Sequence, residues 1–127
     1  MRAIWGALAA SVALIASATG AADDAMATYY GATLVRANES TDTRTWYDKD
    51  GTMKRFRYEK TGNAGGFTVS GQEGRYRLAD GKICETIDSA GQETCTDFTP
   101  RKIGDSWDTT ESGVVNRYRL VRGRSSR

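Results

Sequence analysis

Two cysteines, Cys84 and Cys95, have the most definite chemistry in this sequence, and their spacing suits a disulfide bond. Residues 82–98 predict a β-hairpin whose four-residue loop, 88–91, begins with aspartate and ends with glycine, as tight turns favour. Counting outward from that loop places Cys84 opposite Cys95 in a non-hydrogen-bonded pair, the class of cross-strand pair with the closer side chains. We therefore expect Cys84 and Cys95 to be bonded to each other.

Redox chemistry and metal binding are the other possible uses of the cysteine pair. Redox-active pairs usually hold two residues between the cysteines and lie beside a helix amino terminus, and neither feature is predicted here. A structural zinc site takes about four ligands, whereas the sequence offers two thiols and no histidine. The pair is therefore predicted to be structural, and neither a metal nor another cofactor is expected.

Arginine alternates with large apolar residues in three segments, at 55–58, 75–78 and 117–120. Because successive side chains of a strand point to opposite faces, the apolar residues of these segments are predicted to face the core and the arginines to face outward. The arginines are Arg55, Arg57, Arg75, Arg77, Arg117 and Arg119.

These six arginines have a functional and a structural interpretation. A guanidinium group suits phosphate, carboxylate or sulfate, so six of them on one face would bind an anionic partner. Alternatively, they are ordinary charged outer positions of half-buried strands, paired with acids. The small net charge of +2 favours this second interpretation.

The sequence shows no recognisable catalytic constellation. Without histidine, neither the usual serine or cysteine triad nor a histidine-based metal site can form. Two carboxylate pairs, Asp48 with Asp50 and Asp105 with Asp108, lie in turn-like contexts that call for aspartate. The protein is therefore predicted not to be an enzyme.

The strands that position these residues follow from a period-two pattern of apolar residues interrupted by glycine and aspartate. The pattern predicts an antiparallel all-β domain of eight or nine short strands, at 29–36, 43–48, 52–60, 66–70, 74–79, 82–87, 92–98, 105–110 and 114–121. Turns are expected at 48–51, 71–74, 80–81, 88–91 and 111–113. Such short connections favour a meander that closes into a small up-and-down, lipocalin-like barrel, with a two-sheet sandwich as the alternative.

Residues 1–22 are expected to be a removable, helical signal peptide. Arg2 precedes an alanine-rich apolar run, and small residues before Asp23 match a cleavage site. The run is short for a retained anchor, which needs ~20 strongly apolar residues. We expect residues 23–28 to be a flexible mature amino terminus, 29–122 the β domain and 123–127 a basic disordered tail. A periplasmic or secreted location would let the disulfide persist.

Export restricts the possible partners. Cleavage after residue 22 removes Arg2 and no acid, which leaves 17 of the 18 basic side chains against 16 acidic ones. An acidic glycan, a lipid head group or an acidic envelope protein would suit the arginines, whereas nucleic acid is not expected in that compartment. We expect the protein to be a monomer.

One resemblance rests on turn and cysteine motifs. The leading segment, Asp50-Gly51-Thr52, Asp80-Gly81-Lys82-Ile83-Cys84, Cys95 and Gly104-Asp105 together resemble small exported β-barrel proteins of Gram-negative bacteria. The architecture also resembles that of periplasmic lysozyme inhibitors. The resemblance implies an exported β protein and transfers no activity.

Two functions stay open at this level. The first is a periplasmic binding or interaction protein that recognises its partner through the arginine face or a loop. The second is a lipocalin-like carrier of a small apolar molecule, with Trp46, Tyr47 and Trp107 near an interior cavity. Tryptophan in a small barrel more often belongs to the core, because such interiors are usually filled by side chains.

Overall fold

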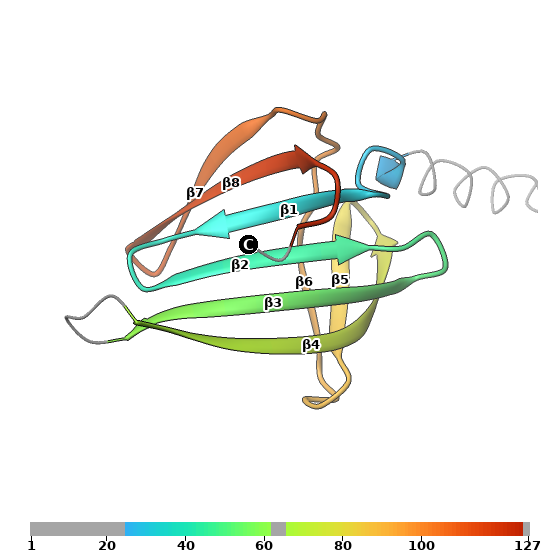
Figure 1. The fold of residues 1–127 in the computed structure, drawn as a ribbon. Coiled ribbons are helices and arrows are strands. Elements are labelled where there is room, and N and C mark those ends of the chain that lie inside the picture. The colour runs from blue at the N-terminus through green and yellow to red at the C-terminus, as the bar shows by residue number, and fades with distance from the viewer. Residues whose placement is uncertain (1–24, 62–65, 126–127) are drawn as a thin grey trace, which may run out of the picture.

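The computed structural model describes residues 25–61 and 66–125, and the predicted signal peptide lies outside these residues. The described chain forms eight strands (Figure 1). They are β1 (Ala32–Ala37), β2 (Thr41–Tyr47), β3 (Thr52–Thr61), β4 (Gly66–Ala79), β5 (Lys82–Ile87), β6 (Glu93–Asp97), β7 (Ser106–Glu111) and β8 (Val114–Arg122). The prediction of an antiparallel all-β domain is confirmed. None of the described residues forms a helix long and apolar enough to cross a membrane.

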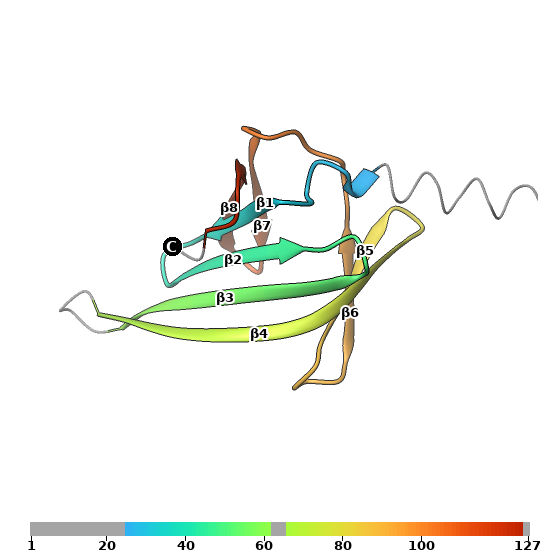
Figure 2. The same cartoon turned by 45° about the vertical axis from the view of Figure 1, so that its right-hand side comes forward.

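All eight strands belong to one sheet in the order β6-β5-β4-β3-β2-β1-β8-β7. Sequential hairpins build β1 to β6 as a meander, and β8 then pairs with β1 rather than with β6. This order is that of an up-and-down barrel opened between β6 and β7. The sheet accordingly curls into a half-barrel, with β1 to β4 on one side and β5 and β6 crossing behind them (Figures 1 and 2).

The turn between β2 and β3 follows the predicted chemistry. The Asp50 side chain accepts a hydrogen bond from the Thr52 backbone N–H at 3.0 Å, and Gly51 has a φ of 89°. Aspartate and glycine are favoured for these two roles. The turn fixes the pairing of Tyr47 with Met53 and hence the register of the whole β2–β3 ladder.

Strand β4 corrects the expectation of a turn at 71–74. It is a single strand of 14 residues in which Gly74 pairs with Met53 of β3 and with Ile87 of β5. A Cβ at Gly74 would collide with the Thr86 carbonyl oxygen, so glycine here allows close approach of β4 and β5. Glycine indicated an interruption in the sequence, whereas in the structure it permits close packing of two strands.

The core lies on the inner face of the curled sheet. Its buried members are Met26, Tyr29, Ala32, Tyr47, Met53, Ile83 and Leu120. Met26 and Tyr29 come from a short turn before β1, in which the Tyr29 N–H donates to the Met26 carbonyl at 2.9 Å. Residues 25–28 were expected to be flexible, but Met26 is 1% exposed because its side chain fills the core.

The described end of the chain, residues 123–125, lies against the outer face of the sheet. The Thr33 hydroxyl donates to the Gly123 carbonyl at 2.7 Å and accepts from the Ser125 N–H at 3.0 Å. Arg124 pairs with Asp48 and donates to the Tyr47 carbonyl at 3.3 Å. Residues 123–125, expected to belong to a disordered tail, are therefore held by β1 and the end of β2.

Candidate functional site

Strands β6 and β7 are the two end strands of the sheet, and residues 66–72 of β4 also pair on one side only, with β3. Within the described part of the chain, β6 pairs only with β5 and β7 only with β8. All five residues of β6 are exposed, whereas β7 keeps Trp107 and Thr109 half-buried. An edge strand presents unpaired backbone N–H and C=O groups, which can pair with another chain.

The two edge strands carry only acidic charge. Their acids are Glu93 and Asp97 in β6 and Asp108 and Glu111 in β7, and neither strand contains lysine or arginine. Each of the six inner strands contains at least one basic residue. Lysine is a common means of protecting an edge from pairing, and it is missing from both edges here.

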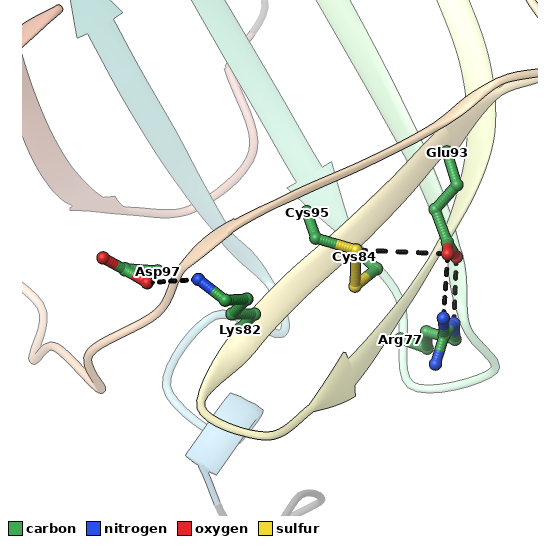
Figure 3. The surroundings of a disulfide bond; sticks show 6 residues. All are labelled: Arg77, Lys82, Cys84, Glu93, Cys95 and Asp97. Atoms are coloured by element: carbon green, nitrogen blue, oxygen red, sulfur yellow. Dashed lines mark hydrogen bonds and ion pairs between the residues drawn. A yellow bond between two sulfur atoms is a disulfide. The ribbon is translucent and has the colours of Figure 1, made fainter.

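A disulfide joins β6 to the rest of the sheet (Figure 3). Cys84 pairs with Cys95 in the register predicted from the hairpin loop, with 3.9 Å between their Cα atoms. Cys84 is 3% exposed, whereas Cys95 is exposed. The predicted bond is confirmed, and it connects the inner part of the sheet to a strand with no buried residue.

The hydrogen-bonding pattern shows which β6 groups face outward. The Phe98 N–H donates to the Gly81 carbonyl at 2.9 Å, which makes this a hydrogen-bonded pair. Because such pairs alternate along an antiparallel ladder, Cys84 and Cys95 form a non-hydrogen-bonded pair. The backbone groups of Cys95, and by the same alternation those of Glu93 and Asp97, point away from β5.

Ion pairs flank the disulfide on the outer face (Figure 3). Arg77 of β4 reaches past β5 to Glu93, with its Nε donating at 2.9 Å and its Nη2 at 2.8 Å. Lys82 Nζ lies 2.7 Å from Asp97 Oδ1. Hydrogen bonds from Arg77 lower the pKa of Glu93, and the hydrogen bond from Lys82 lowers the pKa of Asp97. One covalent bond thus fixes β6 to β5, and two exposed ion pairs lie beside it.

The six predicted arginines divide between the two faces of the sheet. Arg75 and Arg77 are exposed while Tyr76 and Leu78 pack against the core, as predicted for β4. In β8, Leu120 is fully buried and the arginines that flank Tyr118, Arg117 and Arg119, are exposed.

Strand β3 has the opposite orientation to the one expected. Tyr47 pairs with Met53 in the core, and Thr45 pairs with Arg55 two positions on, so Arg55 and Arg57 lie on the inner face. The neighbouring aromatic residues, Phe56 and Tyr58, consequently lie on the outer face, where Phe56 contacts Trp46 and Tyr58 is nonetheless buried. The cause is the β2–β3 turn, which fixes Met53 inside and therefore every second residue after it.

Arg55 forms an internal charged cluster with Glu85 and Tyr47. Its Nη2 lies 3.0 Å from both Glu85 oxygens, its Nε donates to Thr45 Oγ1 at 2.9 Å, and the Tyr47 hydroxyl donates to Glu85. Burial and the nearby Glu85 charge raise the pKa of Tyr47 well above its ordinary value. Burial lowers the pKa of Arg55, but Glu85 and Tyr47 reverse this and raise it. These side chains come from β2, β3 and β5, and each has a hydrogen-bond partner within the cluster. The cluster therefore links the three strands and has a structural role.

The six arginines do not lie together on one face. Strands β4 and β8 are separated by β3, β2 and β1 in the sheet. Besides Arg55 and Arg77, Arg57 lies 3.2 Å from Glu59 and Arg117 lies 3.8 Å from Asp108. Most of the six therefore have an acidic neighbour, as the structural interpretation expects.

The three aromatic residues proposed to line a cavity lie apart. Tyr47 is in the core, whereas Trp46 lies on the outer face beneath the Arg124 guanidinium, 5.4 Å from its ring centre. Trp107 stacks on Tyr118, with ring centres 5.4 Å apart, and carries Arg101 above its ring at 4.2 Å.

A pocket of about 350 Å³ lies beside Trp46, lined also by charged residues of both signs. These are Asp48, Lys54, Glu73, Arg75, Asp88 and Arg124. The indole Nε1 of Trp46 is buried without a hydrogen-bond partner among the described residues. This pocket lies between outer-face side chains and the described end of the chain, not inside the half-barrel.

The carboxylates considered as catalytic pairs have local partners. Asp50 caps the β2–β3 turn, Asp48 pairs with Arg124, and Asp105 accepts from the Lys102 N–H at 2.8 Å. Asp108 lies near Arg117. These contacts match the turn and surface roles that aspartate commonly has.

The edge strands were not predicted as a site from the sequence. Residues 93–97 and 106–111 contain neither lysine nor arginine, but only the sheet order shows that these two segments are edge strands. Comparison adds no relative from which a site could be transferred: no protein-family model, curated protein or solved structure matches the chain.

Proposed function

We propose that this protein is an exported, non-catalytic interaction protein that pairs edge strand β6 with an extended segment of a partner protein. One observation carries the proposal: β6 buries none of its five residues, yet a disulfide bond fixes it to β5. Strands are ordinarily stabilised by packing of side chains. A strand fixed without such packing supports a role for its exposed edge.

Strand addition is a known way for proteins to bind extended peptides. The partner's backbone hydrogen-bonds to an exposed edge, and its alternate side chains provide specificity. In this protein the outward backbone groups belong to Glu93, Cys95 and Asp97, and the covalent bond at Cys95 holds them in position. A pre-ordered edge binds with a smaller loss of conformational entropy than a mobile one.

Export is part of the proposal because of the leading segment and the disulfide. An apolar, alanine-rich start with one arginine suits a signal peptide. Disulfides persist in the periplasm and outside the cell, so a strand that depends on one suits those compartments. The partner is accordingly an envelope or secreted protein.

The other functions considered have weaker support. A carrier of a small apolar molecule needs interior space, but the inner face is occupied by Tyr47, Met53 and Leu120 together with the Arg55–Glu85 pair. An acidic glycan or lipid head group needs arginines that lie together, and these lie on different faces and strands. The absence of histidine supports a non-catalytic role.

Site-specific photo-crosslinking in cells that make the protein naturally tests the proposal. A photoreactive residue at Thr94, exposed on β6, is expected to give an adduct of defined mass that the same residue at exposed Val115 of β8 does not give. The adduct should disappear with Glu93→Pro and persist with Glu93→Ala, because both remove the carboxylate but only proline removes the outward N–H. Equal adducts in the two variants would contradict strand addition.

A further inference from the structure

We infer that the segment bound at β6 is basic, with lysine or arginine four residues apart and an uncharged residue midway between them. This inference rests on the proposed function and specifies the chemistry of the partner. It follows from the charge of the edge strands, the spacing of the β6 side chains and the direction from which their present partners approach.

Charge comes first. Both edge strands carry acids and no basic residue, which distinguishes them from the six inner strands. Like charges directly opposite each other destabilise a strand pair. Pairing of β6 with β7, or of β6 with β6 of a second copy, would bring acids together, whereas a basic segment would bring opposite charges together.

The spacing of β6 side chains gives the pattern of the partner. Glu93, Cys95 and Asp97 share the outer face at every second position, which separates the two carboxylates by roughly 13 Å along the strand. A neighbouring strand places its side chains directly opposite at the same spacing. Two basic residues four positions apart would therefore face Glu93 and Asp97, and the residue midway would face the disulfide sulfur of Cys95.

The existing ion pairs leave this arrangement possible. Arg77 and Lys82 reach Glu93 and Asp97 from the β4 and β5 side, as Figure 3 shows, and the free edge of β6 lies on the other side. A carboxylate has about four acceptor sites and can bind a second cation. Both acids are exposed, and exposed pairs of this kind cost little to rearrange.

Strand β7 is the less suitable edge. Its Trp107 is covered by Tyr118 on one side and by the Arg101 guanidinium 4.2 Å from the ring centre, which places a positive charge beside the strand. Its Asp108 is shared with Arg117. A basic segment is therefore better matched to β6.

Two designed peptides test the inference on the oxidised mature protein. Each alternates threonine and valine over nine residues, with either lysine or glutamate in place of the valines at the fourth and eighth positions. By fluorescence anisotropy at low salt, the lysine peptide is expected to bind about tenfold more tightly than the glutamate peptide. The double substitution E93K/D97K should reverse this preference, and E93Q/D97Q should abolish it without reversing it.

The outcomes separate the charge inference from the proposed function. Equal binding of both peptides, lost in E93P but kept in E93A, would overturn the basic pattern and leave strand addition intact. Preference for lysine that E93P and E93A weaken equally would overturn strand addition. Failure of both peptides to bind, or a β6-paired dimer in light scattering of the wild type, would overturn the inference, while the crosslinking at Thr94 still judges the proposed function.

Discussion

Arg55 is a charged side chain that lies on the inner face of the sheet and has hydrogen-bond partners there. The guanidinium contacts Glu85 and Thr45, and Glu85 also accepts from the Tyr47 hydroxyl. The side chains of Arg55 and Glu85 are 23% and 19% exposed, so water screens the pair only in part. A half-buried pair depends on both partners, because removal of one leaves the other desolvated and uncompensated.

The Glu85→Gln substitution is therefore expected to destabilise the fold by about 2 kcal/mol, below the range for fully buried pairs because some water reaches the site. Glu59→Gln is the matched control. It removes the partner of Arg57 in a pair that is about half exposed, and exposed pairs contribute about 0–1 kcal/mol. Urea unfolding followed by tryptophan fluorescence measures both changes. Equal effects of the two substitutions would contradict the assignment of Arg55 to the interior.

Alternation in the sequence could not decide which face of β3 is inner. In 55–58 the period of two is clear, but arginine and aromatic residues both satisfy it. Hydrophobicity favoured Phe56 and Tyr58 as core residues, and Tyr58 is indeed buried. The β2–β3 turn and the burial of Met53 nevertheless place both aromatic residues on the outer face, and this depends on pairing with β2.

At the scale of elements, the hairpin β5–β6 was the most predictable part. Its loop length and turn residues fix the register, and the pairing of Cys84 with Cys95 followed from counting. Strand β4 was less predictable, because glycine occurs both in turns and in strands that bend. Gly71 and Gly74 look alike in the sequence and differ only in the neighbouring strand that each approaches.

This difference gives a paired prediction. Gly74→Ala should destabilise the fold by about 2–3 kcal/mol, because the added methyl group would meet the Thr86 carbonyl of the adjacent strand. At Gly71 an added Cβ would lie 3.8 Å from Phe56, an ordinary contact. Gly71→Ala should therefore change stability by less than about 1 kcal/mol. Thermal unfolding followed by circular dichroism compares them, and equal melting temperatures would contradict the close approach of β5 to Gly74.

At the scale of the whole molecule, the half-barrel has its core at one end and its edges open. The predicted meander is confirmed, and the pairing of β8 with β1 is the one that an up-and-down barrel requires. The opening of the barrel between β6 and β7 was not predictable from local turn signals, and the identity of the edge strands depends on it. The candidate site was therefore hidden from the sequence even though the disulfide within it was predicted.

Tyrosines of the core make stability sensitive to alkaline pH. Burial raises the pKa of Tyr29 to about 12 from its ordinary value of 10.0. Below the ordinary value both folded and unfolded chains hold the proton, so the stabilisation is complete. Above it the unfolded chain loses the proton first, so the free energy of unfolding should fall as pH rises towards 12.

Urea unfolding at about pH 9 and about pH 11 measures this dependence. Tyr29→Phe should make the loss between these two conditions smaller than in the wild type, although Tyr47, whose pKa is also raised, keeps part of the dependence. An unchanged difference in the variant would show that Tyr29 titrates alike in the folded and unfolded chain.

Pairing of β1 with β8 also affects how the chain reaches its native state. Ala32 lies opposite Arg122, so two of the central strands come from opposite ends of the described sequence. A ribosome or a translocation pore that delivers the chain from its amino terminus releases β1 long before β8, and such long-range contacts form slowly. During that interval the backbone groups on the β8 side of β1 are unpaired, and another nascent chain can pair with them. This protein would therefore benefit from a chaperone until synthesis or transport is finished.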